Sequence, residues 1–169
     1  MSNSMILGGF VGLVLVLAVV LVARSKLSRG DFDERQLLLR GQAYQMAFLS
    51  VLVLAGVHGI IVTFSDSPIM EDGVGSILII FVGIMVFAVE SILRDAFFTV
   101  KSKPVPYLVI CGICVASGLL GGISNLRAGT VIQNGLLTTD CFPLAQAVVF
   151  LVVLLTILWK NFLRKEREE

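Results

Sequence analysis

The stretch AYQMAFLSVLVLAGVHGIIVTFSDSPIMEDGVGSILIIFVGIMVFAVESIL, residues 43–93, decides the fold of this chain. It contains two apolar segments, 43–64 and 74–93, each long enough to cross a hydrocarbon layer of about 30 Å as an α-helix. The segment between them, SDSPIMEDG, carries acidic residues and no basic residue, which is compatible with a loop outside the membrane. The stretch therefore predicts a pair of antiparallel membrane-spanning helices.

Three further apolar segments of similar length occur at 5–23, 105–124 and 143–162. Hydrophobic residues make up 57% of the chain and charged residues 15%, and the mean hydropathy is +0.97, far above the range of soluble globular proteins. We therefore expect an all-α integral membrane bundle of five transmembrane helices, forming a single domain over residues 1–169 in a lipid bilayer.

The positions of lysine and arginine predict the orientation of this bundle. In a five-span arrangement all of the 13 basic residues except Arg127 fall on one side, and cytoplasmic loops retain positive charge. The N-terminus is thus expected outside and the C-terminus inside. A cleavable signal peptide is the alternative for the first span, although MSNS lacks a positive charge and the apolar run is long for one. A net charge of +1 gives no argument for nucleic-acid binding.

Small residues at a spacing of four recur in the spans and permit close approach between helices. They include Gly8 with Gly12 in the first span, and Gly118 with Gly122 in the glycine-rich segment 105–124. Packing within one chain and contact between copies in a homo-oligomer are both compatible with this spacing. The glycine content predicts that the fourth span is the centre of the bundle.

The loop expected over residues 124–143 has turn signals at Asn125, Gly129 and Asn134-Gly135. It is expected to form a short hairpin or to lie on the surface. It is also the largest expected surface on the outer side, where binding residues could gather.

Cys111 and Cys114 form a C-x-x-C motif, which also occurs in membrane thiol oxidoreductases. In the expected orientation Cys111 lies about 9 Å inside the cytoplasmic boundary, at 1.5 Å per residue from the start of its span. Cys141 is at the other end of the bundle and too distant to act as a resolving cysteine. Structural packing of the cysteines is therefore favoured over redox chemistry.

Two ionisable side chains lie inside the expected spans, where such groups are costly and are functional candidates. His58 is the only histidine and lies slightly beyond the membrane midplane, so that neutral packing and a proton or ligand site are the alternatives. Glu90 lies near the cytoplasmic end, at a different depth, and can pair with Arg94 at i+4. We expect no metal site, no cofactor and no catalytic residues, because no nucleophile elbow, phosphate loop, H-E-x-x-H motif or paired catalytic carboxylates appears.

Charges gather in GDFDERQLLLRGQAY, residues 30–44, directly before the second span. Asp31 and Glu34 have capping-box spacing, and acidic groups including Asp33 suit the positive end of a helix dipole. Arg35 can pair with Asp31 at i+4, and Arg40 can reach the lipid headgroups. These patterns predict a single helix that begins in the cytosol and continues into the bilayer.

The same stretch resembles a family. D-E-R-Q at 33–36, R-G-Q-A-Y at 40–44 and A-F at 47–48 resemble the signature of small, uncharacterised bacterial multispan membrane proteins. The resemblance implies a bacterial cell membrane and gives no catalytic residue. It directs attention to the cytosolic entrance of the second span.

Two functional hypotheses follow. The first is a non-enzymatic accessory or regulatory membrane protein that contacts a membrane or cytoplasmic protein partner through Asp33, Glu34, Arg35, Arg40 and neighbouring cytoplasmic segments. The second is a small oligomeric transporter or channel subunit that uses His58 and the glycine-rich fourth span. A thiol enzyme is a weaker third hypothesis.

Overall fold

The computed structural model describes residues 33–65, 67–98 and 105–166, and Glu34–Glu169 form one compact unit. The expected first span, 5–23, lies outside the described residues. The elements follow the chain in the order α2 (Glu34–Phe64), α3 (Val74–Leu93), α4 (Val105–Ala128), β1 (Ile132–Gln133), β2 (Leu136–Leu137), η2 (Thr139–Cys141) and α5 (Phe142–Glu166).

The prediction of an all-α fold is confirmed for the described part of the chain, where four helices are long and apolar enough to cross a membrane. Helix α3 has the bounds expected from the sequence, and α2 begins at Glu34, so a single helix does run through the charged stretch into the apolar one. Helix α4 continues to Ala128, four residues beyond the expected end at 124, and Arg127 belongs to its last turn.

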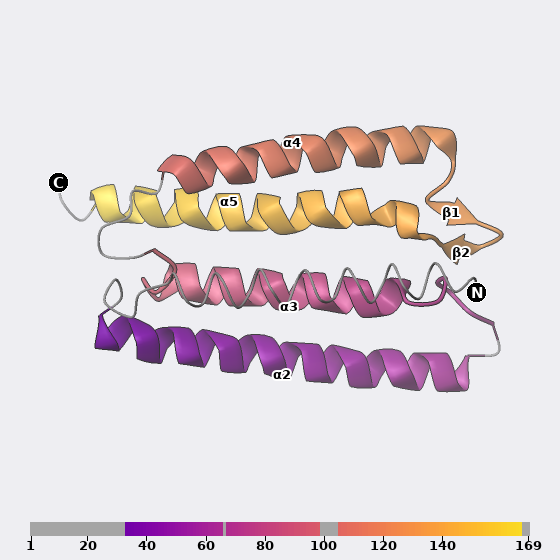
Figure 1. The fold of residues 1–169 in the computed structure, drawn as a ribbon, viewed down its shortest axis with the longest axis horizontal. Coiled ribbons are helices and arrows are strands. Elements are labelled where there is room, and N and C mark those ends of the chain that lie inside the picture. Colours follow the sequence, from indigo (N-terminus) through magenta and orange to yellow (C-terminus); the bar gives the residue numbers. More distant parts are fainter. Residues whose placement is uncertain (1–32, 66, 99–104, 167–169) are drawn as a thin grey trace, which may run out of the picture. The chain divides into compact units, whose positions relative to one another are not determined.

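The four helices lie side by side in the order α2, α3, α5, α4 (Figure 1), with α2 against α3, α3 against α5, and α5 against α4. Helices α3 and α5 therefore each have two large helical neighbours, whereas α4 packs mainly on α5. The prediction that the fourth span forms the centre is wrong for the helices that the structure describes. The glycines of α4 permit a close approach to one neighbour, α5, but they do not determine how many helices pack against α4.

The contact between α4 and α5 depends on Gly118 and Gly122, both buried. A Cβ atom at Gly118 would lie 2.7 Å from the carbonyl oxygen of Pro143 and 3.0 Å from the Cβ of Ala147. A Cβ atom at Gly122 would lie 2.3 Å from Leu144 Cδ2. This small-residue pair is used for packing within the chain.

Helix α2 packs on α3 through another small-residue pair. Ala43 and Ala47 are buried. Tyr44, which follows Ala43 in the sequence, stacks its ring on that of Phe87 of α3, with the ring centroids 4.3 Å apart. Much of the remaining α2 surface is apolar and exposed, as is expected of a helix that meets lipid or another apolar surface on its other side.

The two loops at the far end of these helices are joined by backbone hydrogen bonds. Asn134 and Gly135 have φ of 51° and 79°, the positive values that a two-residue Asn-Gly hairpin turn requires, and they connect β1 to β2. The Leu137 amide donates to the Ile69 carbonyl at 3.0 Å, and the Glu71 amide donates to the Leu137 carbonyl at 2.9 Å. The predicted hairpin is confirmed, and we call this end of the unit the hairpin end.

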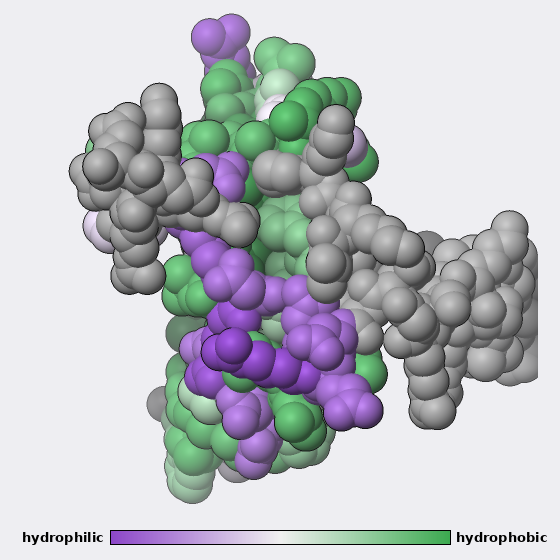
Figure 2. All heavy atoms as spheres, turned by 90° about the vertical axis from the view of Figure 1, so that its left-hand side faces the viewer, coloured by the Kyte–Doolittle hydropathy of each residue, from purple (hydrophilic) through white to green (hydrophobic). Residues whose placement is uncertain are grey.

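At the opposite end α2 and α4 begin and α3 and α5 finish. We call it the basic end, because it carries Arg35, Arg40, Arg94 and Lys160. Seen from this side, hydrophilic residues gather in one patch framed by hydrophobic ones (Figure 2).

Candidate functional site at the basic end

The turn at residues 94–98 ends α3 in a Schellman arrangement. The Ala96 amide donates to the Ser91 carbonyl at 2.8 Å, and the Asp95 amide donates to the Ile92 carbonyl at 3.2 Å. Asp95 occupies the left-handed position with φ of 58°, where glycine is the usual residue. An aspartate here adds a carboxylate to the end of the helix.

Lys160 of α5 binds this turn. Its ammonium donates to the Ile92 carbonyl, to the Leu93 carbonyl at 2.8 Å, and forms an ion pair with Asp95 Oδ1 at 2.9 Å. The carbonyls at the end of a helix lack partners within the helix and carry partial negative charge, so a cation is well placed there. The Asp95 side chain is 78% exposed, and the ion pair itself contributes little; the carbonyl contacts are the main role of Lys160.

Helix α2 reaches the same turn through two glutamines. Gln36 Nε2 donates to the Asp95 carbonyl at 2.9 Å and to the Phe98 carbonyl at 3.3 Å. Gln42 Oε1 accepts from Arg94 Nη1 at 2.7 Å. Arg94 also pairs with Glu90 at 2.7 Å, as the i+4 spacing predicts. Glu90 is thus part of this polar cluster.

Aromatic side chains connect the turn to α4. The rings of Phe97 and Phe98 pack edge-to-face with each other, and both pack edge-to-face with Tyr107 in the first turns of α4, with centroids 5.9 Å and 5.0 Å away. The 94–98 turn therefore follows α3 directly and contacts α2, α4 and α5.

The charged residues at the start of α2 point elsewhere. Asp33, Glu34 and Arg35 are exposed, and their side chains make no hydrogen bond or ion pair with a described residue. Arg40 is half-buried and takes part in an interaction within the protein. Glu34 is the first residue of α2, so its carboxylate suits the helix dipole. The expected capping box with Asp31 requires Glu34 at the third helical position, so this prediction is wrong; Asp31 itself lies outside the described residues.

His58 lies near the hairpin end of α2, away from this cluster. Its imidazole is half-buried and packs against the backbone of Gly75, where a Cβ atom would lie 2.3 Å from His58 Cε1. Gly75 and Glu90 are fifteen residues apart on α3, about 22 Å along the helix at 1.5 Å per residue. The geometry brings His58 to the start of α3 and separates it from Glu90.

The cysteines belong to two different packing clusters. Cys111 is buried with Ala88 and Ile157 near the basic end, and Cys141 is buried with Val74 near the hairpin end. Cys114 is half-buried, and all three thiols are free.

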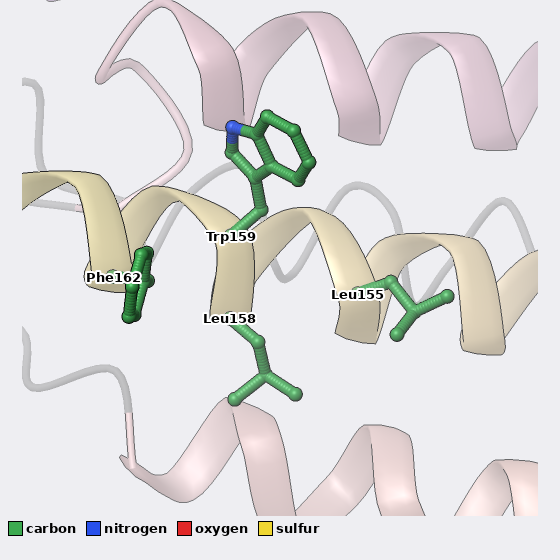
Figure 3. A pocket seen from close by; sticks show the side chains of 4 residues that line it. All are labelled: Leu155, Leu158, Trp159 and Phe162. Carbon is green, nitrogen blue, oxygen red and sulfur yellow. The ribbon is translucent and has the colours of Figure 1, made fainter.

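An apolar groove of about 680 Å³ lies on α5. Figure 3 shows Trp159 and Leu158 pointing to opposite sides of α5, toward the two helices that flank it, with Leu155 and Phe162 on the same stretch of helix. The indole nitrogen of Trp159 is the only polar atom among the four lining side chains, which fits a surface that faces acyl chains.

Sequence reasoning missed four members of the polar cluster: Gln36, Gln42, Asp95 and Lys160. Gln36 lies within the motif that resembles a family signature, so that motif was the available signal for it, whereas Gln42 occupies a variable position of the same motif. Comparison with protein-family models, with curated proteins and with solved structures finds no match. The site is therefore defined by its geometry, as the basic end of a helical bundle of membrane type.

Proposed function

We propose that this protein is a non-enzymatic accessory or regulatory membrane protein that binds a protein partner through the start of α2. In this proposal the chain has five spans, the first at 5–23, with its N-terminus outside and its C-terminus in the cytoplasm of a bacterial cell. The distribution of basic residues supports this orientation. It puts the basic end, including the start of α2, at the cytoplasmic surface.

The observation that carries the proposal is the division of the start of α2 into two faces. One face is used by the fold: Gln36 binds the 94–98 turn, and Ala43 is buried against α3. The other face presents Glu34 and Leu38, with Leu38 72% exposed, beside the exposed charge of Arg35. An exposed apolar side chain among charges of both signs is a composition suited to a protein contact with a polar rim.

The length of α2 makes this face accessible. Its 31 residues extend about 46 Å at 1.5 Å per residue, whereas the hydrocarbon layer is about 30 Å thick. With the apolar segment 43–64 in the bilayer, residues 34–42 lie among the headgroups and beyond. A cytoplasmic protein or the cytoplasmic part of another membrane protein can then reach them.

Co-purification in mild detergent tests the proposal. The double variant Asp33→Ala/Arg35→Ala should lose the co-purifying partner, because it removes one charge of each sign from the proposed contact. The matched control is Asp72→Ala/Arg127→Ala, which removes the same two charge types from exposed positions toward the hairpin end. Equal recovery of the partner with the unmodified protein and with both double variants would contradict the proposal.

A small oligomeric transporter or channel subunit is the alternative function. It draws support from His58, an ionisable group between α2 and α3 in the expected membrane region. The buried glycines of α4 do not support the transporter alternative, because they face α5. Solute flux in proteoliposomes that depends on pH, and that disappears in His58→Phe, would favour this alternative.

A further inference from the structure

The 94–98 turn lies between two contacts made from different helices. Gln36 of α2 donates to its backbone at Asp95 and Phe98, and Lys160 of α5 binds the Asp95 carboxylate. The backbone hydrogen bonds of the Schellman turn and the two hydrogen bonds from Gln36 stabilise Asp95 in the left-handed conformation, which is unfavourable for a residue with a Cβ atom. The turn thus places a residue other than glycine in a left-handed conformation and receives hydrogen bonds from a neighbouring helix.

We propose that the 94–98 turn is a conformational coupling between the start of α2 and the end of α5. When Gln36 is displaced, Asp95 leaves the left-handed conformation and its carboxylate moves away from Lys160. The carbonyls of Ser91 and Ile92 lose their Schellman hydrogen bonds at the same step, and the contacts of Lys160 with the carbonyls of Ile92 and Leu93 weaken as the last turn of α3 loosens. The ammonium of Lys160 is then released toward the membrane surface.

The coupling gives the proposed partner a route to the rest of the bundle. Gln36 follows Arg35 directly and lies within one helical turn of Asp33, so a partner that shifts the start of α2 acts on its hydrogen bonds. In this respect the inference rests on the proposed function. The coupling itself is a property of the chain and can be measured without a partner.

The test compares Gln36→Ala with Gln45→Ala in the purified full-length protein. Gln45 lies on the same helix, is exposed, and its side chain makes no hydrogen bond with a described residue, so it is a matched control. The reaction rate of Lys160 with an amine-reactive reagent should rise at least about fivefold in Gln36→Ala, because the variant loses two hydrogen bonds and about fivefold is the factor expected for one. Deuterium uptake at residues 94–98 should rise with it. An unchanged rate in Gln36→Ala, or an equal rise in Gln45→Ala, would overturn the coupling.

The variant Asp95→Gly separates this mechanism from general loosening. Glycine adopts the left-handed conformation without strain, so the turn should persist without Gln36. Adding Gln36→Ala to Asp95→Gly should then raise deuterium uptake at the turn much less than Gln36→Ala alone, and an equal rise would reject the proposed role of strain. Loss of partner capture is a separate readout: if Asp33→Ala/Arg35→Ala keeps the partner, the proposed function fails while the coupling result stands.

Discussion

The substitution of Gly118 by alanine examines the contact of α4 with the backbone of α5. The new Cβ would lie 2.7 Å from the Pro143 carbonyl oxygen and 3.0 Å from the backbone nitrogen of Ala147. Both are backbone atoms of α5, which cannot rotate away as a side chain can, so α4 and α5 must separate. Overpacking of this kind costs about 1–3 kcal/mol.

The matched control is Gly112→Ala on the same helix, where a Cβ would meet no atom within 4 Å. Both substitutions gain about 1 kcal/mol from the higher helix propensity of alanine, so this gain cancels in the comparison. Reversible unfolding in detergent should therefore place Gly118→Ala about 1–3 kcal/mol below Gly112→Ala. Equal unfolding free energies for the two variants would refute the packing of α4 on α5 through its glycines.

Two further predictions concern the ends of α3. The Cβ of Gly75→Ala would overlap the His58 imidazole, so this variant should lose about 1–3 kcal/mol of unfolding free energy, and the added change His58→Ala should restore most of it. Additive effects in the double-mutant cycle would argue against this contact. At the basic end, Lys160→Met should lower the unfolding free energy by about 1–3 kcal/mol by leaving helix carbonyls unpaired, and Asp95→Asn by less than about 1 kcal/mol. A larger loss of unfolding free energy in Asp95→Asn than in Lys160→Met would contradict the assignment of the carbonyl contacts as the main role of Lys160.

Local patterns in the sequence were sufficient for much of the fold. The bounds of α3, the Asn134-Gly135 turn and the pairing of Glu90 with Arg94 all depend on residues close in sequence, and the structure confirms each of them. Apolar length, turn conformation and i+4 spacing are properties that neighbouring residues determine without the rest of the chain.

The polar cluster could not be predicted in this way. Gln36 and Asp95 are 59 residues apart, and their hydrogen bond exists only because α2 packs beside α3 in one particular register. Lys160 was recognised as one of many basic residues on one side, whereas its carbonyl partners depend on α5 lying beside α3. The wrong choice of the central helix has a related cause: glycines indicate how closely a helix can be approached, and the order of the helices depends on all of their surfaces together.

Site-specific photo-cross-linking in living cells tests the central claim, that the start of α2 is the surface that a partner recognises. A photoreactive amino acid replaces Leu38 in one protein and Leu120 of α4 in another; these leucines are 72% and 74% exposed, so the described helices cover neither probe, and position 120 lies in the proposed membrane region. The account predicts a discrete cross-linked protein adduct from position 38, weakened by Asp33→Ala/Arg35→Ala, and none from position 120. No protein adduct at position 38, or the same adduct at both positions, would contradict it.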